Sequence, residues 1–176
     1  KHHNTHTIVA KKVAQLQAKL DLAQIPVKIY PGCELRLCHP SFVRESIERN
    51  EASLLGPSGK FLLLEQRWKD YETKTPDVIE WVQNRGIQPI LAHPERHFFF
   101  REHPERLTKL IELGIWTQVS VDSLLGKNGP DALAYSRHLI KHDHIHTLAS
   151  DSHNTRRKPN LSAGFEKVEE WGSKQQ

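Results

Sequence analysis

The sequence predicts an α/β protein in which parallel β-strands alternate with helices and deliver metal ligands from one end. Three observations support this. Short apolar runs recur along the 176 residues, with helical patterns between them. Glycine and proline residues mark many of the boundaries. Acidic and histidine residues directly follow four of the apolar runs, at Glu34, Glu65, His93 and the pair Asp151 and His153.

The first part of the chain is predicted to hold a helix, a strand and a second helix. Apolar residues between Val9 and Leu20 are spaced three and four apart, which places them on one helix face. The apolar run 27–33 is predicted as the strand that leads to Glu34. A short helix around 42–49 follows.

The next strand and helix are predicted from turn and capping signals. A Gly-Pro-Ser-Gly turn at 56–59 leads into strand 60–64, which ends before Glu65. The segment Thr75-Pro76-Asp77 then starts a helix, with a hydroxyl N-cap, a proline in the first turn and an acid facing the helix dipole. Gly86 is predicted to end this helix.

The rest of the chain repeats the alternation. The expected elements are strand 88–92, a helix from about 104 to 114, strand 116–121, a helix from 130 to about 141, strand 145–150 and a last amphipathic helix around 161–168. Five strands alternating with helices imply a parallel sheet with right-handed crossovers, within a single domain 1–176. Ligands on nearly every strand favour a barrel, because in an open sheet they gather at one switch point.

The composition excludes several classes of protein. The net charge is +4, but basic and acidic residues are interleaved, so charge does not predict nucleic-acid binding. Two cysteines, Cys33 and Cys38, are too few for a disulfide framework or a four-thiolate zinc site and fit a reducing, cytoplasmic location. No apolar stretch approaches the roughly 18 residues of a membrane span. The 12 histidines are the anomaly, since histidine is the commonest metal ligand.

The segment His93-Pro-Glu-Arg-His97 is the densest group of chemically active residues. A histidine at a strand end, with Arg96 three residues on, pairs a metal ligand with a cation that can grip a phosphate through two nitrogens. The alternative interpretation is a polar loop in which Glu95 and Arg96 form a surface ion pair.

A second group lies at Asp151 and His153, whose side chains would leave an extended strand end on the same face. The alternative is a helix-capping aspartate beside an exposed histidine. Polar and basic residues follow and would form a rim suited to an anionic substrate, namely Asn154, Arg156, Arg157 and Lys158.

Glu34 and Glu65 are candidate oxygen ligands. A carboxylate can bridge two divalent ions, and two-metal sites hold a hydroxide for in-line attack on phosphorus. Oxygen and imidazole ligands without thiolate favour Mn, Fe or Zn over Ca. If Glu34 instead simply pairs with Arg36, no metal dependence is expected. The segment 118–123 is expected to supply supporting polar contacts.

With these residues the chain resembles the PHP (polymerase and histidinol phosphatase) superfamily. Within it, the chain is similar to bacterial manganese-dependent tyrosine-protein phosphatases of capsule and exopolysaccharide biosynthesis. The resemblance runs over almost the whole chain, through His2-His3 and the segments 31–36, 62–65, 91–96, 118–127 and 149–154. The His-Pro-Glu-Arg and Ser-Asp-x-His-Asn blocks in this order are fairly specific to that branch.

The resemblance implies a distorted, TIM-like (β/α)7 barrel with two or three divalent ions, Mn²⁺ or else Fe or Zn. The implied metal ligands are His2, Glu34, Glu65, His93, Asp151 and His153. Arg96 would bind phosphate, together with Arg157 or, if the alignment shifts by one, Lys158.

The implied reaction is attack of a metal-activated hydroxide on phosphotyrosine. The substrate would be a phosphotyrosyl protein, by analogy a bacterial tyrosine kinase of polysaccharide export. Two alternatives keep the site but change the substrate, to a small phosphate monoester such as histidinol phosphate or to a nucleic-acid phosphodiester. A further alternative is a non-catalytic metal-binding domain. The oligomeric state is not predicted.

The beginning of the chain departs from the family pattern. The family opens with an Asp-x-His-x-His strand that supplies further ligands, and this strand has no counterpart here. The sequence begins at Lys1 and contains no methionine. We therefore expect an N-terminally incomplete domain that lacks the first strand of the barrel.

Overall fold

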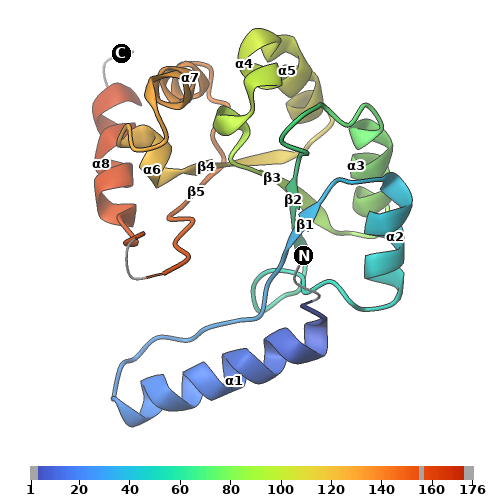
Figure 1. The fold of residues 1–176 in the computed structure, drawn as a ribbon, viewed down its shortest axis with the longest axis vertical. Coiled ribbons are helices and arrows are strands. Elements are labelled where there is room, and N and C mark those ends of the chain that lie inside the picture. Colours follow the sequence, from blue (N-terminus) through green and yellow to red (C-terminus); the bar gives the residue numbers. More distant parts are fainter. Residues whose placement is uncertain (1–3, 155–156, 173–176) are drawn as a thin grey trace.

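The structure is a computed structural model that describes residues 4–154 and 157–172, and its centre is one parallel sheet (Figure 1). Each strand pairs in parallel with the strand that follows it in the chain, so the order is β1-β2-β3-β4-β5. The strands are β1 (Glu34–Arg36), β2 (Phe61–Glu65), β3 (Gln88–Ala92), β4 (Trp116–Ser120) and β5 (Thr147–Ala149). The predicted parallel sheet of five strands is confirmed.

Helices connect the strands and, apart from the first, surround the curved sheet in Figure 1. They are α1 (His6–Leu22), α2 (Pro40–Glu48), α3 (Thr75–Gln83), α4 (Phe98–Glu102), α5 (Pro104–Glu112), α6 (Val121–Leu124), α7 (Pro130–Lys141) and α8 (Leu161–Gly172), with a 3₁₀ turn η1 (Pro94–Arg96). Helix α1 forms where its apolar spacing predicts it, but none of its residues is buried. In Figure 1 it lies apart from the other helices.

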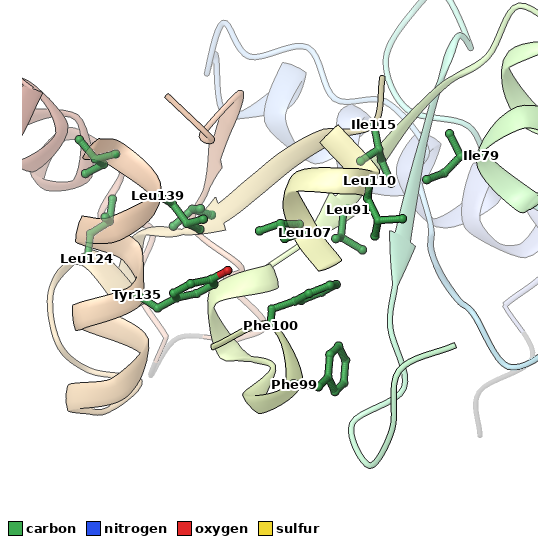
Figure 2. Packing of buried hydrophobic residues seen from close by; sticks show 12 residues of the cluster. Ile79, Leu91, Phe99, Phe100, Leu107, Leu110, Ile115, Leu124, Tyr135 and Leu139 are labelled. Atoms are coloured by element: carbon green, nitrogen blue, oxygen red, sulfur yellow. The ribbon is translucent and has the colours of Figure 1, made fainter. Parts of the chain in front are cut away.

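The core lies between the sheet and these surrounding helices. Figure 2 shows Leu91 of β3 close to Phe100, Leu107 and Leu110 of α4 and α5, all nearly inaccessible to solvent. A second cluster joins β1 and β2 to α2 and α3 through residues such as Leu64. Burying each such side chain contributes roughly 1.5–3 kcal/mol, so the core fixes the strand ends that carry the polar residues.

The prediction of a strand over residues 27–33, before Glu34, is wrong. Residues 25–33 have no regular structure, and β1 begins at Glu34, which pairs with Leu63 of β2. Two prolines, Pro26 and Pro31, have no N–H to donate to a strand ladder, which disfavours pairing over this stretch. Glu34 is therefore the first residue of its strand, whereas Glu65 is the last of β2 and His93 directly follows β3.

Two details of the helices also differ from the predictions. Thr75 is the first residue of α3 rather than its N-cap, because its hydroxyl donates to the carbonyl of Glu72 and accepts from Gln66 Nε2. Helix α4 was not predicted, since three consecutive phenylalanines within five residues hide any helical period. Across the described ranges, no helix is long and apolar enough to cross a membrane.

Candidate metal and phosphate site

Three of the predicted ligands meet at the sheet. His93 Nε2 lies 3.1 Å from Glu34 Oε1 and 3.7 Å from Glu65 Oε1, and one ligand atom from each residue lies within 4.8 Å of the others. His93 and Glu65 are buried, whereas Glu34 is exposed. Parallel pairing of β1, β2 and β3 brings these side chains together from positions up to 59 residues apart in sequence.

This donor set fits a divalent ion. Two carboxylates and one imidazole nitrogen are the oxygen and nitrogen ligands that Mn, Fe and Zn accept. Arg36 forms an ion pair with Glu65, at 2.7 Å between Nη2 and Oε2, so the alternative in which Arg36 simply neutralises Glu34 is wrong. The second ring nitrogen of His93, Nδ1, is buried and has no hydrogen-bond partner among the described residues. Stacking on Trp68, with ring centroids 5.4 Å apart, holds this ring instead.

The backbone around His93 is strained and firmly anchored. His93 has a φ of 33°, in the left-handed region that disfavours residues with a Cβ, at a cost of roughly 1–3 kcal/mol. Its N–H donates to the carbonyl of Gln118 over 2.7 Å. Asp151 is also left-handed, with a φ of 47°. Such outliers persist where surrounding contacts enforce them, often at functional sites.

Glu95 provides the strongest of these anchors. Its carboxylate is fully buried and accepts hydrogen bonds from the Ser120 N–H at 3.2 Å and the Ser123 hydroxyl at 2.6 Å. Burial raises the pKa of Glu95. The surface ion pair between Glu95 and Arg96 is therefore wrong, because Glu95 points into the protein. The supporting role expected of segment 118–123 is confirmed.

Two arginines converge on Asp151, which lies just beyond β5. Arg96 Nη1 donates to Asp151 Oδ2 over 3.0 Å, and Arg157 Nη2 donates to the same oxygen over 2.6 Å. The Asp151 side chain is 14% exposed, and those of Arg96 and Arg157 are 24% and 33% exposed. The two partly accessible guanidinium groups therefore lie together on one carboxylate oxygen, and such groups are suited to hydrogen-bonding a phosphate.

The remaining predicted site residues lie farther out. His153 is exposed, and its Nδ1 accepts from Arg157 Nη1 over 3.0 Å. The left-handed backbone at Asp151 ends the extended path, so the predicted extended strand end is wrong. The two side chains nevertheless lie together, with His153 Nδ1 3.4 Å from Asp151 Oδ1. Lys158 is exposed. His2 lies outside the described residues.

One aromatic residue of the site, Trp68, was missed in the sequence, and His97 was included in the predicted group but given no role. Trp68 contacts the rings of His93 and His97, and the Arg96 guanidinium lies 4.9 Å from its ring centroid. His97 is buried between Trp68 and Phe99, and burial, followed by the nearby His93, lowers its pKa from 6.5 to about 3. The only signal for Trp68 was a large aromatic residue within a polar loop.

Fold and site together define an α/β protein in which two carboxylates and an imidazole that could hold a metal ion lie near a pair of arginines on Asp151. The family model described as capsular polysaccharide synthesis, CpsB/CapC, matches residues 1–175, and the chain belongs to this family.

Named relatives and a solved structure agree with this membership. Tyrosine-protein phosphatase YwqE of Bacillus subtilis is 30% identical over 155 residues, which cover 88% of this chain and 60% of YwqE. Tyrosine-protein phosphatase CpsB of Streptococcus pneumoniae is 27% identical over 120 residues, or 65% of this chain and 49% of CpsB. A solved structure from a study of YwqE and CpsB, described there as unique metal-dependent tyrosine phosphatases, matches with a TM-score of 0.88 and 28% identity. That match covers 96% of this chain and 70% of the solved chain. The chain thus spans about half to three-fifths of these curated relatives.

Proposed function

We propose that this protein hydrolyses phosphotyrosine on proteins that regulate capsular or exopolysaccharide synthesis, in a metal-dependent reaction. The observation that carries the proposal is the group formed by Glu34, Glu65 and His93. Arg96 follows His93 by three residues and shares Asp151 with Arg157. Membership of the CpsB/CapC family and the names of YwqE and CpsB support the choice of substrate.

The proposed cofactor is Mn²⁺, with Fe or Zn as alternatives, in a cluster of two or three ions. Glu34, Glu65 and His93 would hold the first ion, and the further proposed ligands are His2, Asp151 and His153. When bound, such ions lower the pKa of water and thereby supply a nucleophile near neutral pH.

The arginines act on the phosphoryl group. Arg96 and Arg157 both donate to Asp151 Oδ2, so their guanidinium groups already lie side by side. A phosphoryl group there would receive hydrogen bonds from both, and these would neutralise the charge of the transition state. The departing tyrosinate, whose conjugate acid has a pKa of about 10, needs only modest acid assistance.

Three wider features of the protein are proposed on the same basis. The consecutive strand order supports a sheet that forms part of a distorted, TIM-like (β/α)7 barrel, with residues 1–176 in one domain. The proposed partner is a bacterial tyrosine kinase of polysaccharide export. The proposed compartment is the cytoplasm, where the free thiols of Cys33 and Cys38 would stay reduced.

Phosphate release tests this function directly. The purified protein would be assayed with a phosphotyrosyl peptide and with histidinol phosphate, in Mn²⁺ and again after chelation. Release from the peptide that chelation abolishes is the expected result. Release from histidinol phosphate alone would replace the substrate with a small monoester, and no release at any metal loading would favour a non-catalytic domain.

A further inference from the structure

A pocket of about 290 Å³ opens beside the proposed phosphate-binding arginine. It is lined by Trp68, Arg96, Arg101, Asn128 and the first residues of α7 with the preceding glycine, Gly129 to Ala132. Arg96 belongs both to this pocket and to the pair of arginines on Asp151. A group esterified to a phosphate held by Arg96 would therefore enter this pocket or lie at its mouth.

One wall of the pocket is aromatic and held in place from behind. The Trp68 ring stacks on His93, with an interplanar angle of 17°, and lies 4.7 Å from the ring of His97. Even so, 40% of Trp68 stays exposed. The buried imidazoles hold the indole in place and the Arg96 guanidinium lies 4.9 Å from its centroid, so the exposed part of the ring offers an apolar surface next to a cation.

The rest of the lining is polar at Arg101, Asn128 and Asp131 and small at Gly129, Pro130 and Ala132. Pro130 and Ala132 belong to the first turn of α7, and Gly129 precedes them with a φ of 93°, a backbone conformation that favours glycine. Arg101 does not swing freely into the space, because its Nη1 donates to the Glu95 carbonyl over 3.2 Å. Small side chains here leave the space opposite Trp68 open.

The size of the pocket limits what it can hold. Small-molecule sites generally measure roughly 300–1,000 Å³, so this pocket lies at the lower end of that range. It suits a single ring better than a nucleotide or a sugar chain. An aromatic wall, small residues that leave space beside it and an adjoining arginine together fit an aryl phosphate, whose ring would lie against Trp68 within an otherwise polar lining.

We propose that this pocket is the subsite for the aryl group of the phosphoester, and that Trp68 sets a preference for aryl over alkyl phosphates. The inference rests on the proposed function and refines it, because the phenol ring of phosphotyrosine is the aryl group in question. Trp68 is thus a specificity-determining residue that contacts the substrate side chain.

Binding of two phosphonates that are not hydrolysed tests the subsite without relying on turnover. Phenylphosphonate and methylphosphonate would be titrated calorimetrically into the Mn²⁺-loaded protein. The wild type should bind the phenyl compound about tenfold more tightly, as expected for one well-packed aromatic contact. In Trp68→Leu this preference should fall to about twofold or less, whereas Trp68→Phe should keep most of it.

A matched control and a second variant of the pocket lining distinguish loss of the subsite from loss of the fold. Trp116 is also partly exposed, but it is the first residue of β4 and stands outside the pocket, so Trp116→Leu should keep the full preference. If Trp68→Leu does not fold, Ala132→Ile narrows the pocket from α7. That variant should weaken phenylphosphonate binding and spare methylphosphonate.

The outcomes separate this inference from the proposed function. Equal binding of both phosphonates by the wild type would overturn the subsite even if phosphotyrosine is hydrolysed. An unchanged preference for phenylphosphonate in Trp68→Leu would overturn it too, and Ala132→Ile gives the same test if Trp68→Leu does not fold. Failure of the wild type to bind either phosphonate would overturn it as well. A Trp68-dependent aryl preference in a protein that releases no phosphate from phosphotyrosyl peptide would support the subsite and overturn the proposed function.

Discussion

Arg96 connects the proposed metal and phosphate sites, since it follows His93 by three residues and donates to Asp151. Arg96→Ala should lower kcat/KM for a phosphotyrosyl peptide by about 10²–10³-fold, as loss of one charge-stabilising donor does elsewhere. Its unfolding midpoint should change little, because Arg157 still neutralises Asp151. Arg49→Ala, at an exposed ion pair with Glu45, is the control that should keep full activity. Wild-type turnover in Arg96→Ala would remove Arg96 from the mechanism.

Glu95 is a positioning residue, and two replacements at this position should differ in their effect on stability. Glu95→Ala leaves the Ser120 N–H and the Ser123 hydroxyl without their buried acceptor and should cost about 1–3 kcal/mol in urea unfolding. Glu95→Gln keeps an acceptor oxygen and should cost clearly less, because burial raises the pKa of Glu95 and disfavours its charge. Equal destabilisation by both replacements would show that the negative charge, rather than the acceptor geometry, holds the loop.

The residues of the site could be predicted only where a strand end marked them. Glu65 and His93 were predicted to converge because parallel strands end at one edge, and they do. Trp68, Glu95 and His97 could not be assigned from the sequence, since their roles depend on packing between distant segments. The backbone conformation of Asp151 was equally out of reach, because left-handed geometry at a non-glycine residue has no simple sequence signal.

At the scale of elements, the apolar runs of β2 to β5 and the glycine and proline residues at the boundaries of α5 and α7 predicted these elements well. The strand predicted over segment 27–33 does not form. The alternating apolar residues of this segment look like a strand, but strand formation needs a paired neighbour, and β1 pairs with β2 only over Glu34–Arg36. Apolar spacing likewise predicted α1 but not its exposure, since burial depends on what packs against the helix.

Close packing of α8 on α6 gives a test of the fold. A Cβ added at Gly164 would lie 2.5 Å from Val121 Cγ2, and Val121 is fully buried. Gly164→Ala should therefore destabilise the protein by about 1–3 kcal/mol, although alanine favours helices by about 1 kcal/mol. Gly172→Ala, with nothing within 4 Å of the added Cβ, is the matched control. An unchanged denaturation midpoint in Gly164→Ala would contradict the packing of these two helices.

The stability of the protein should depend on pH through His146, which precedes β5 and bonds to β4. His146 Nδ1 accepts the Thr117 N–H over 3.1 Å, and burial, followed by the charge of His144, lowers the pKa of His146 from 6.5. The unfolded chain therefore binds this proton more readily than the folded protein, so the stabilisation is complete above about pH 6.5 and is lost as the pH falls below it. His146→Asn keeps an acceptor without titrating there and should lose less stability than the wild type between about pH 7 and 5.5.

A control histidine makes that comparison specific. His39 caps α2 by accepting the Ser41 N–H, a role that asparagine also fills, and it lies far from β5 in sequence. His39→Asn should keep the wild-type loss of stability on acidification, measured by urea unfolding at both pH values. If His146→Asn loses as much stability as the wild type, His146 does not contribute to the acid sensitivity.

For the molecule as a whole, the central claim is that Glu34, Glu65 and His93 form a divalent metal site. Their convergence across three strands places two carboxylates and an imidazole within 4.8 Å of one another. Arg36 pairs with Glu65 and so balances the charge of only one of the two carboxylates. A bound cation should therefore stabilise the folded protein, which links metal binding to folding stability. At a free concentration of 100 times its Kd, Mn²⁺ should stabilise the protein by about 2.7 kcal/mol.

A calorimetric titration of Mn²⁺ into metal-free protein tests this claim most directly, with wild type and Glu65→Gln compared at the same pH. Saturable binding to the wild type is expected, accompanied by a higher unfolding temperature. Binding to Glu65→Gln should be at least about tenfold weaker, or about 1.4 kcal/mol, because the ion loses a buried charged ligand. Glu45→Gln, at an exposed position of α2, should bind as the wild type does. Equal Mn²⁺ binding by wild type and Glu65→Gln, or no saturable binding by the wild type, would contradict the assignment of this group as a metal site.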